Sequence, residues 1–171
     1  MEYDTLIELA DGSALARQAR ACFAALARRH DLRPYLFTGR IRIDPAARPH
    51  SHPVLTLNAE HVEEPERFLA VFLNLEMRWC LERQTVEPAL VEGALRAIFP
   101  GLAAGTTAGG SAPLRLAAAW LEFRALIDLL GRAAAQRVVD THRHDRRIYD
   151  LATRHEIEIG ALLQSLGLRL P

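Results

Sequence analysis

The sequence predicts an α+β fold, in which a small antiparallel β-hairpin or sheet packs with about five to six helices. Two observations predict it. Two short β-like runs lie close together between residues 35 and 57, and the chain after residue 65 has an almost uninterrupted helical pattern. Because 171 residues suit one domain, a single domain is expected over 1–171, with residues 1–35 as its N-terminal helical segment.

The first helix is expected over 13–29, where Ser13 can cap it and apolar residues recur at helical spacing. The first β-like run follows at 35–43 and the second at 54–57. The segment between them, DPAARPHSHP, contains three prolines and reads as a loop. Two strands joined by such a loop predict an antiparallel pair.

The remaining helices are predicted from their apolar stripes and their stop signals. The segment 65–83 has a broad apolar face, which is typical of a central and largely buried helix. The Gly-rich stretch GLAAGTTAGGS at 101–111 is a candidate lid or loop. Further helical segments are expected at 85–98, 111–130 and 132–154, and a last one ends at residue 166.

Composition excludes several classes of function. The 21 basic residues balance 21 acidic ones, which argues against a nucleic-acid partner. Every basic residue is arginine, so no mechanism that needs a lysine is open. No apolar run approaches the roughly 20 residues of a membrane helix, and the start MEYDTLIELADG does not resemble a secretory signal. Cys22 and Cys80 match no zinc-binding spacing, and they favour a reducing, cytoplasmic compartment.

A resemblance becomes visible when residues 50–82, HSHPVLTLNAEHVEEPERFLAVFLNLEMRWCLE, are considered together. They are similar to an uncharacterised bacterial group of small zincin-like, metallopeptidase-type proteins, in which a strand of this form precedes a helix carrying HExxHW. The stretch APLRLAAAWLEFRALIDLLG at 112–131 is similar to a second helix of that group, which carries a His and then a Leu-Glu-aromatic triplet. The resemblance covers about 36–171 and implies a minimal zincin-like domain.

The metal-binding chemistry of that group does not match. Aligned on Trp79, the two histidines that would hold zinc are Asn74 and Arg78, and the glutamate that would act as general base is Leu75. The later histidine corresponds to Arg115. Asn is a poor zinc ligand, Leu cannot accept a proton, and Arg is a permanent cation. No metal and no cofactor is therefore expected.

The first hypothesis is a catalytically degenerate zincin-like protein that acts as a binding or regulatory module and is not an active peptidase. Its partner would be a peptide or protein aligned along the strand 53–58, or a small anionic ligand. The alternative is a repurposed enzyme that is not a peptidase. It would use an Arg/Glu pocket on the same scaffold, in which arginines hold a carboxylate or phosphate and Glu122 or His52 acts as acid or base. The third and least favoured hypothesis is a metal-dependent hydrolase using His50 and His52. The resemblance implies a pocket formed by Asn74, Arg78, Arg115, Glu122, His50 and His52.

Simpler interpretations stand beside these. Arg78 and Glu82 are spaced as a surface ion pair, and His50 and His52 can simply orient a turn. Cys80 is expected to be a buried apolar residue. The arginine-rich segment 132–154, which includes His142, His144 and Asp145, is expected to be a solvated helical face rather than a phosphate-binding or metal-binding one. Tyr149 is expected to pack with its hydroxyl at the surface.

Overall fold

The structure is a computed structural model, and it describes residues 6–83, 86–102, 106–107, 110–142 and 145–168. The chain forms two compact units, Met1–Trp79 and Cys80–Pro171. The boundary falls inside the long helix α2 (Pro65–Arg83), so that most of this helix belongs to the first unit. The expectation of a single domain over 1–171 stays a prediction.

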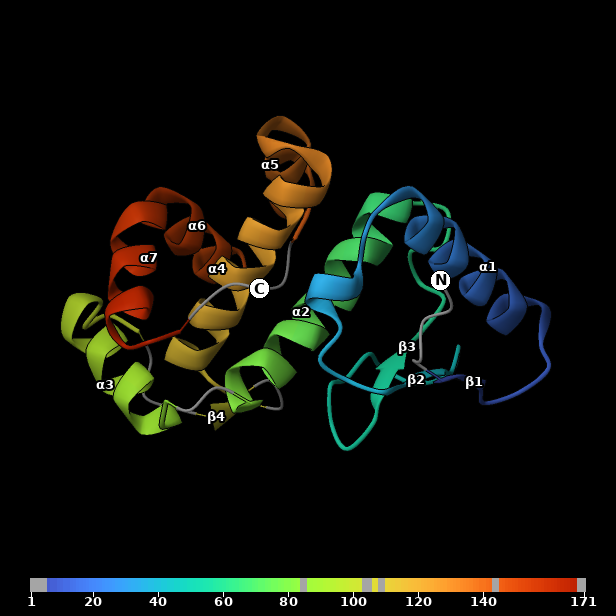
Figure 1. Cartoon of the computed structure of the whole chain (residues 1–171), viewed down its shortest axis with the longest axis horizontal. Helices are drawn as coiled ribbons and strands as arrows, with labels where there is room; N and C mark the ends of the chain where they lie inside the picture. The colour runs from blue at the N-terminus through green and yellow to red at the C-terminus, as the bar shows by residue number, and fades with distance from the viewer. Residues whose placement is uncertain (1–5, 84–85, 103–105, 108–109, 143–144, 169–171) are drawn as a thin grey trace. The chain divides into compact units, whose positions relative to one another are not determined.

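The first unit contains a three-stranded sheet with helices (Figure 1). The strands β1 (Leu6–Leu9), β2 (Arg40–Ile43) and β3 (Leu55–Leu57) lie in the order β1-β2-β3. The helix α1 (Ala14–Arg29) and a short 3-10 helix (Arg33–Tyr35) connect β1 to β2. Ser13 caps α1 as predicted, since its side chain accepts a hydrogen bond from the Ala16 amide at 3.1 Å.

The predicted antiparallel pairing of the strands is wrong, because all three strands run parallel. Leu6 is in register with Arg40, and Ile41 is in register with Leu55. Parallel neighbours need a connection of about a dozen residues. The helix α1 supplies it between β1 and β2, and the loop 44–54 returns the chain between β2 and β3. The prolines in that loop indicated a break in the sheet, but they did not indicate the direction in which the chain would re-enter it.

The core of the first unit lies on one face of this sheet. Ile41 and Ile43 are fully buried, while Arg40 and Arg42 on the alternate positions of β2 are exposed. The helices cover the apolar face. Phe23 of α1 and Phe72 of α2 meet there in an edge-to-face arrangement, with their ring centroids 5.0 Å apart. The predicted central helix is confirmed over Pro65–Arg83, and its side chains Phe68, Leu69, Phe72 and Leu73 are buried.

The second unit is mostly helical and is built around α4 (Ala112–Leu130), which contacts every other helix wholly within it (Figure 1). Ser111 caps α4 and Gly131, with φ at 81°, ends it as predicted. The other elements are α3 (Pro88–Ile98), the antiparallel pair β4 (Thr106–Thr107) and β5 (Gly110–Ser111), α5 (Arg132–Asp140), α6 (Arg146–Arg154) and α7 (Glu156–Ser165). The candidate lid at 101–111 thus contains β4 and β5, and its remaining central residues lie outside the described part of the chain.

The helical segment predicted over 132–154 is two helices, α5 and α6. Asp145 precedes α6 in a left-handed conformation with φ at 62°, which an α-helix cannot contain. This break raises the number of α-helices in the described residues to seven, so the prediction of five to six was low. None of the described helices combines the length and the apolar character that crossing a membrane requires.

Candidate functional site

In the group that residues 50–82 resemble, the metal ligands would lie on the helix that corresponds to α2. The residues at those positions here, Asn74, Leu75 and Arg78, lie in the first unit. Leu75 is buried with 4% exposure and belongs to the apolar core. Asn74 and Arg78 are half-buried, and the Nε atom of Arg78 is shielded from solvent. These amide, aliphatic and guanidinium groups do not fit a zinc ion, because none of them offers the imidazole, thiolate or carboxylate donors that zinc prefers.

Glu76 lies between Leu75 and Arg78 in the sequence, and its carboxylate is fully buried. Its Oε2 accepts hydrogen bonds from the backbone amides of Phe37 at 2.8 Å and of Thr38 at 3.2 Å. The Thr38 hydroxyl donates to Oε1 at 3.2 Å. The carboxylate therefore holds the segment before β2 against α2, and it serves the fold of the first unit.

The two histidines before β3 have local structural partners. The backbone of His50 pairs with Thr56, with N–O distances of 3.1 and 2.8 Å, and so forms an antiparallel bridge on the outer edge of β3. His52 stacks on Trp79, with ring centroids 3.9 Å apart, and the Trp79 indole donates to the carbonyl of Ser51 at 2.8 Å. These contacts support the simpler interpretation, in which both histidines fix the turn into the strand.

A buried acidic cluster lies in the second unit around Glu122 of α4. The Glu122 side chain is fully buried, and the Tyr149 hydroxyl on α6 donates to its Oε2 at 2.5 Å. The Nε2 atom of His142 lies 3.4 Å from Glu122 Oε1. The imidazole of His142 also stacks on the Tyr149 ring, with centroids 4.3 Å apart and an angle of 6° between the planes. A carboxylate, a phenol and an imidazole thus meet at one buried point.

Arg115, which the resemblance places near Glu122, pairs with Asp145 at 3.2 Å. Asp145 is the residue with positive φ between α5 and α6, so this ion pair fixes the start of α6 to α4. Within the second unit, the structure brings together Arg115 and Asp145, and separately Glu122, Tyr149 and His142. Grouping residues of both units into one pocket stays a prediction.

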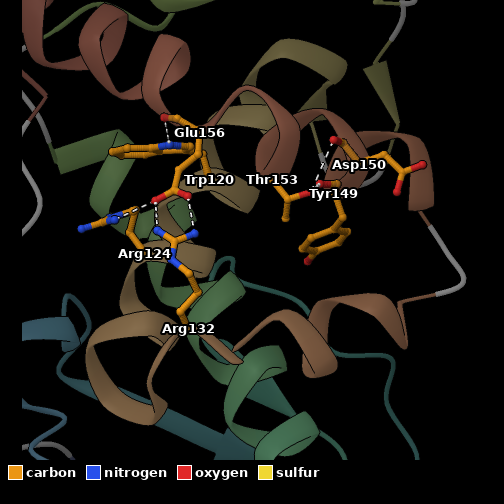
Figure 2. Close-up of polar contacts among 7 residues, drawn as sticks. All are labelled: Trp120, Arg124, Arg132, Tyr149, Asp150, Thr153 and Glu156. Atoms are coloured by element: carbon orange, nitrogen blue, oxygen red, sulfur yellow. Dashed lines mark hydrogen bonds and ion pairs between the residues drawn. The ribbon is translucent and has the colours of Figure 1, made fainter. Parts of the chain in front are cut away.

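A third polar cluster attaches α7 to the rest of the second unit. Figure 2 shows the Glu156 carboxylate between two guanidinium groups, with Arg124 at 2.7 Å and Arg132 at 2.7 Å. The Trp120 indole donates to the Glu156 carbonyl at 2.8 Å. The hydrogen bonds from Arg132, and then those from Arg124, keep the pKa of the Glu156 carboxyl below its usual range. These contacts hold the start of α7 against α4 and α5, so the cluster serves the fold of the second unit.

The α5–α6 cleft is a hollow of about 400 Å³ on the second unit. Polar and charged side chains form most of its lining, and the buried residues Val139 and Tyr149 contribute to it from α5 and α6. The complete lining is Gln136, Val139, Asp140, Arg146, Tyr149, Asp150, Thr153 and Arg154.

Sequence reasoning missed Tyr149 as a partner of Glu122. Its hydroxyl was expected at the surface, but the residue is 8% exposed and the hydroxyl points inward. The signal was available, because Tyr149 lies with Ile148 and Ala152 on the apolar stripe of an otherwise charged helix. The solvated face expected for this segment is confirmed only in part: Arg154 and Asp150 form an exposed i,i+4 pair at 3.8 Å, whereas His142 is largely buried. His144 lies outside the described residues.

Comparisons of this chain with protein-family models, with curated proteins and with solved structures found no match. Among the residues that the structure describes, no three His, Cys, Asp or Glu side chains are grouped so that they could hold a metal ion. Cys80 is buried, as expected.

Proposed function

We propose that this protein is a zincin-like chain without peptidase activity, and that it acts as a binding module for a small charged ligand. The observation that carries the proposal is the chemistry of the residues on α2 that stand where the resemblance places the zinc ligands and the general base. Leu75, at the position of the general base, is an apolar core residue with 4% exposure. A leucine cannot take a proton from water, and Asn74 and Arg78 are not zinc ligands.

The neighbouring carboxylate does not replace the missing base. Glu76 is fully buried, and its two oxygens accept hydrogen bonds from the backbone and side chain of the segment 37–38. A general base must reach a substrate proton or a water. A carboxylate that is enclosed by its own fold and already hydrogen-bonded at both oxygens is poorly suited to that task.

The outer edge of β3 favours a small ligand over an extended peptide. A peptide that adds to a sheet needs free main-chain groups on the edge strand. The amide and the carbonyl of Thr56, which face outward from β3, are both bonded to His50. An incoming peptide would have to displace this bridge before it could pair with the strand.

The alternative of a repurposed enzyme draws support from Glu122. This buried carboxylate lies within 3.4 Å of the His142 imidazole and 2.5 Å of the Tyr149 hydroxyl. A carboxylate that contacts an imidazole is a recurring arrangement in acid-base catalysis. In this second candidate function, Glu122 orients His142, which is 20% exposed and can exchange protons with a bound molecule.

Zinc content and peptidase activity of the purified full chain test the proposed function. We expect the wild-type protein to contain well below one zinc per chain and to cleave no peptide. The double variant Asn74→His and Arg78→His restores two imidazoles one helical turn apart on α2, at the positions that the resemblance aligns, and it should acquire zinc. The variant Arg83→His adds a histidine at an exposed site on the same helix and serves as the matched control.

Stoichiometric zinc in the wild-type protein, or cleavage of a peptide at a useful rate, would overturn the proposed function. A double variant that folds, as judged by circular dichroism, but holds no more zinc than the Arg83→His control would contradict the zincin-like resemblance.

A further inference from the structure

The charges that line the α5–α6 cleft are balanced. Arg146 and Arg154 are the two cations, and Asp140 and Asp150 are the two anions. A simple anion such as phosphate would meet two carboxylates in this cleft, and a simple cation would meet two guanidinium groups. A molecule with one charge of each sign can satisfy both sets at once.

Some of these charged groups are available to a ligand. Within the described part of the chain, the Arg146 guanidinium has no ion-pair or hydrogen-bond partner. Asp150 is paired only loosely with Arg154, at 3.8 Å between exposed side chains, and such a pair contributes little to stability. A ligand can therefore replace that contact at little cost.

Two of the four charges lie where their own helices disfavour them. Arg146 is the first residue of α6, at the positive end of the helix dipole, and Asp140 is the last residue of α5, at the negative end. Each such placement is locally unfavourable. Asp140 is accounted for locally, because it accepts a hydrogen bond from Gln136 at 2.9 Å, whereas Arg146 has no such partner in the described part of the chain and would gain from the negative charge of a ligand. Departures from local rules of this kind are typical of functional sites.

The uncharged part of the lining fits the rest of a small organic ion. Val139 and the ring of Tyr149 are buried apolar surfaces, which suit an aliphatic side chain. The Thr153 hydroxyl donates to the Tyr149 carbonyl at 2.9 Å, as Figure 2 shows, so its oxygen can still accept a hydrogen bond from an ammonium group. The volume of about 400 Å³ lies in the range of small-molecule sites.

We propose that the α5–α6 cleft binds a free α-amino acid with an apolar side chain. Its carboxylate pairs with Arg146 and its ammonium with Asp150, while its side chain rests on Val139 and Tyr149. The inference rests on the proposed binding function, for which it names the site and the class of ligand. It also gives Tyr149 a second role, because the ring that lines the cleft carries the hydroxyl bonded to Glu122.

Isothermal titration calorimetry on the full chain tests this proposal with L-leucine, L-valine and L-phenylalanine as probes. We expect at least one of them to bind. The analogues of leucine that lack one charge, 4-methylpentanoate and isopentylamine, should bind about tenfold more weakly or worse, because a charged group of the cleft is then left unpaired. Inorganic phosphate should not bind in the cleft.

Variants locate the site. Arg146→Gln and Asp150→Asn each remove one charge from the lining, and each should weaken amino-acid binding by about tenfold or more. Arg137→Gln removes an exposed charge of α5 that does not line the cleft, and it should bind as the wild type does. Because these side chains are exposed or half-exposed, the variants should retain the wild-type melting temperature, which circular dichroism checks.

The proposal is overturned if none of the three amino acids binds at about 10 mM, if an analogue with one charge binds as tightly as leucine, or if Arg146→Gln binds as the wild type does. Failure of the proposed function has a different signature. Zinc and peptide cleavage in the same preparation would overturn the proposed function. The binding measurements on Arg146→Gln and Asp150→Asn would still show whether the cleft binds an amino acid.

Discussion

Glu76 and Glu122 are both fully buried glutamates, one in each unit, and their surroundings differ in kind. Glu76 receives two backbone amides, whose positions are fixed by the chain, in addition to the hydroxyl of Thr38. Glu122 receives the hydroxyl of Tyr149 and lies beside the imidazole of His142, and both groups can rotate or exchange protons. Donors that cannot move suit a structural carboxylate, whereas donors that can move suit one whose charge or partner changes during function.

The largest effect is expected from Glu76→Gln. The glutamine oxygen can still accept from the backbone amides of Phe37 and Thr38, but these hydrogen bonds lose the charge of the carboxylate, and the amide nitrogen replaces the acceptor of the Thr38 hydroxyl. Weakening these buried, charge-assisted hydrogen bonds should lower the free energy of unfolding by about 3 kcal/mol. Urea denaturation followed by circular dichroism measures this loss.

The comparison between the two carboxylates requires Glu122→Gln to cost less than Glu76→Gln, because the Tyr149 hydroxyl can turn to suit the new amide. The exposed Glu66→Gln on α2 is the control, and it should remain within about 0.5 kcal/mol of the wild type. Equal losses for the two buried sites would remove the distinction between fixed and mobile donors.

A smaller effect is expected from Tyr149→Phe, which deletes the hydroxyl that donates to Glu122 at 2.5 Å. A hydrogen bond to a buried carboxylate contributes about 2 kcal/mol, and the ring of phenylalanine preserves the packing against His142. The measurement is a double-mutant cycle with Glu122→Gln, in which the coupling energy should be about 1–2 kcal/mol. Additive losses would show that the two side chains do not act together.

The elements with a strong apolar period could be predicted from the sequence. The bounds of α2 and α4 agree with the predicted ones within a residue. Ser111 and Gly131 mark the two ends of α4, Pro65 suits the first position of α2, and both helices have a continuous apolar face. The direction of the strands could not be predicted, since it depends on β1, whose four residues LIEL have no flanking signal, and on the path of the loop 44–54. Both are consequences of tertiary packing rather than of local pattern.

For the candidate site, the sequence identifies the residue types but not their partners. That Asn74, Leu75 and Arg78 cannot reproduce a zinc site follows from chemistry alone. The contact between Glu122 and Tyr149 joins residues 27 positions apart on different helices, and the spacing within either helix does not indicate it. The α5–α6 cleft depends on the break at Asp145, where a non-glycine residue adopts positive φ. The apolar periodicity continues on both sides of this break, so the sequence pattern does not reveal it.

Glu156 extends the comparison to a carboxylate that is only partly buried and is held by arginines, and it should give the smallest effect. Its pKa is lowered in the folded protein, chiefly by the hydrogen bonds from Arg132. The stabilisation is therefore complete above the pKa of an unfolded glutamate, near 4.3, and it is lost as the pH falls through the lower folded value. In Glu156→Gln the neutral amide keeps one acceptor for the arginines, so the free energy of unfolding at pH 7 should fall by about 1 kcal/mol.

Urea unfolding between pH 7 and pH 3 measures this difference. The free energies of unfolding of the wild type and of Glu156→Gln should converge at the acidic end, because protonation removes the charge that distinguishes the two side chains. A difference that persists unchanged at pH 3 would mean that the two arginines respond to the shape of the side chain and not to its charge, and Glu156 would then resemble Glu76 in being held by geometry alone.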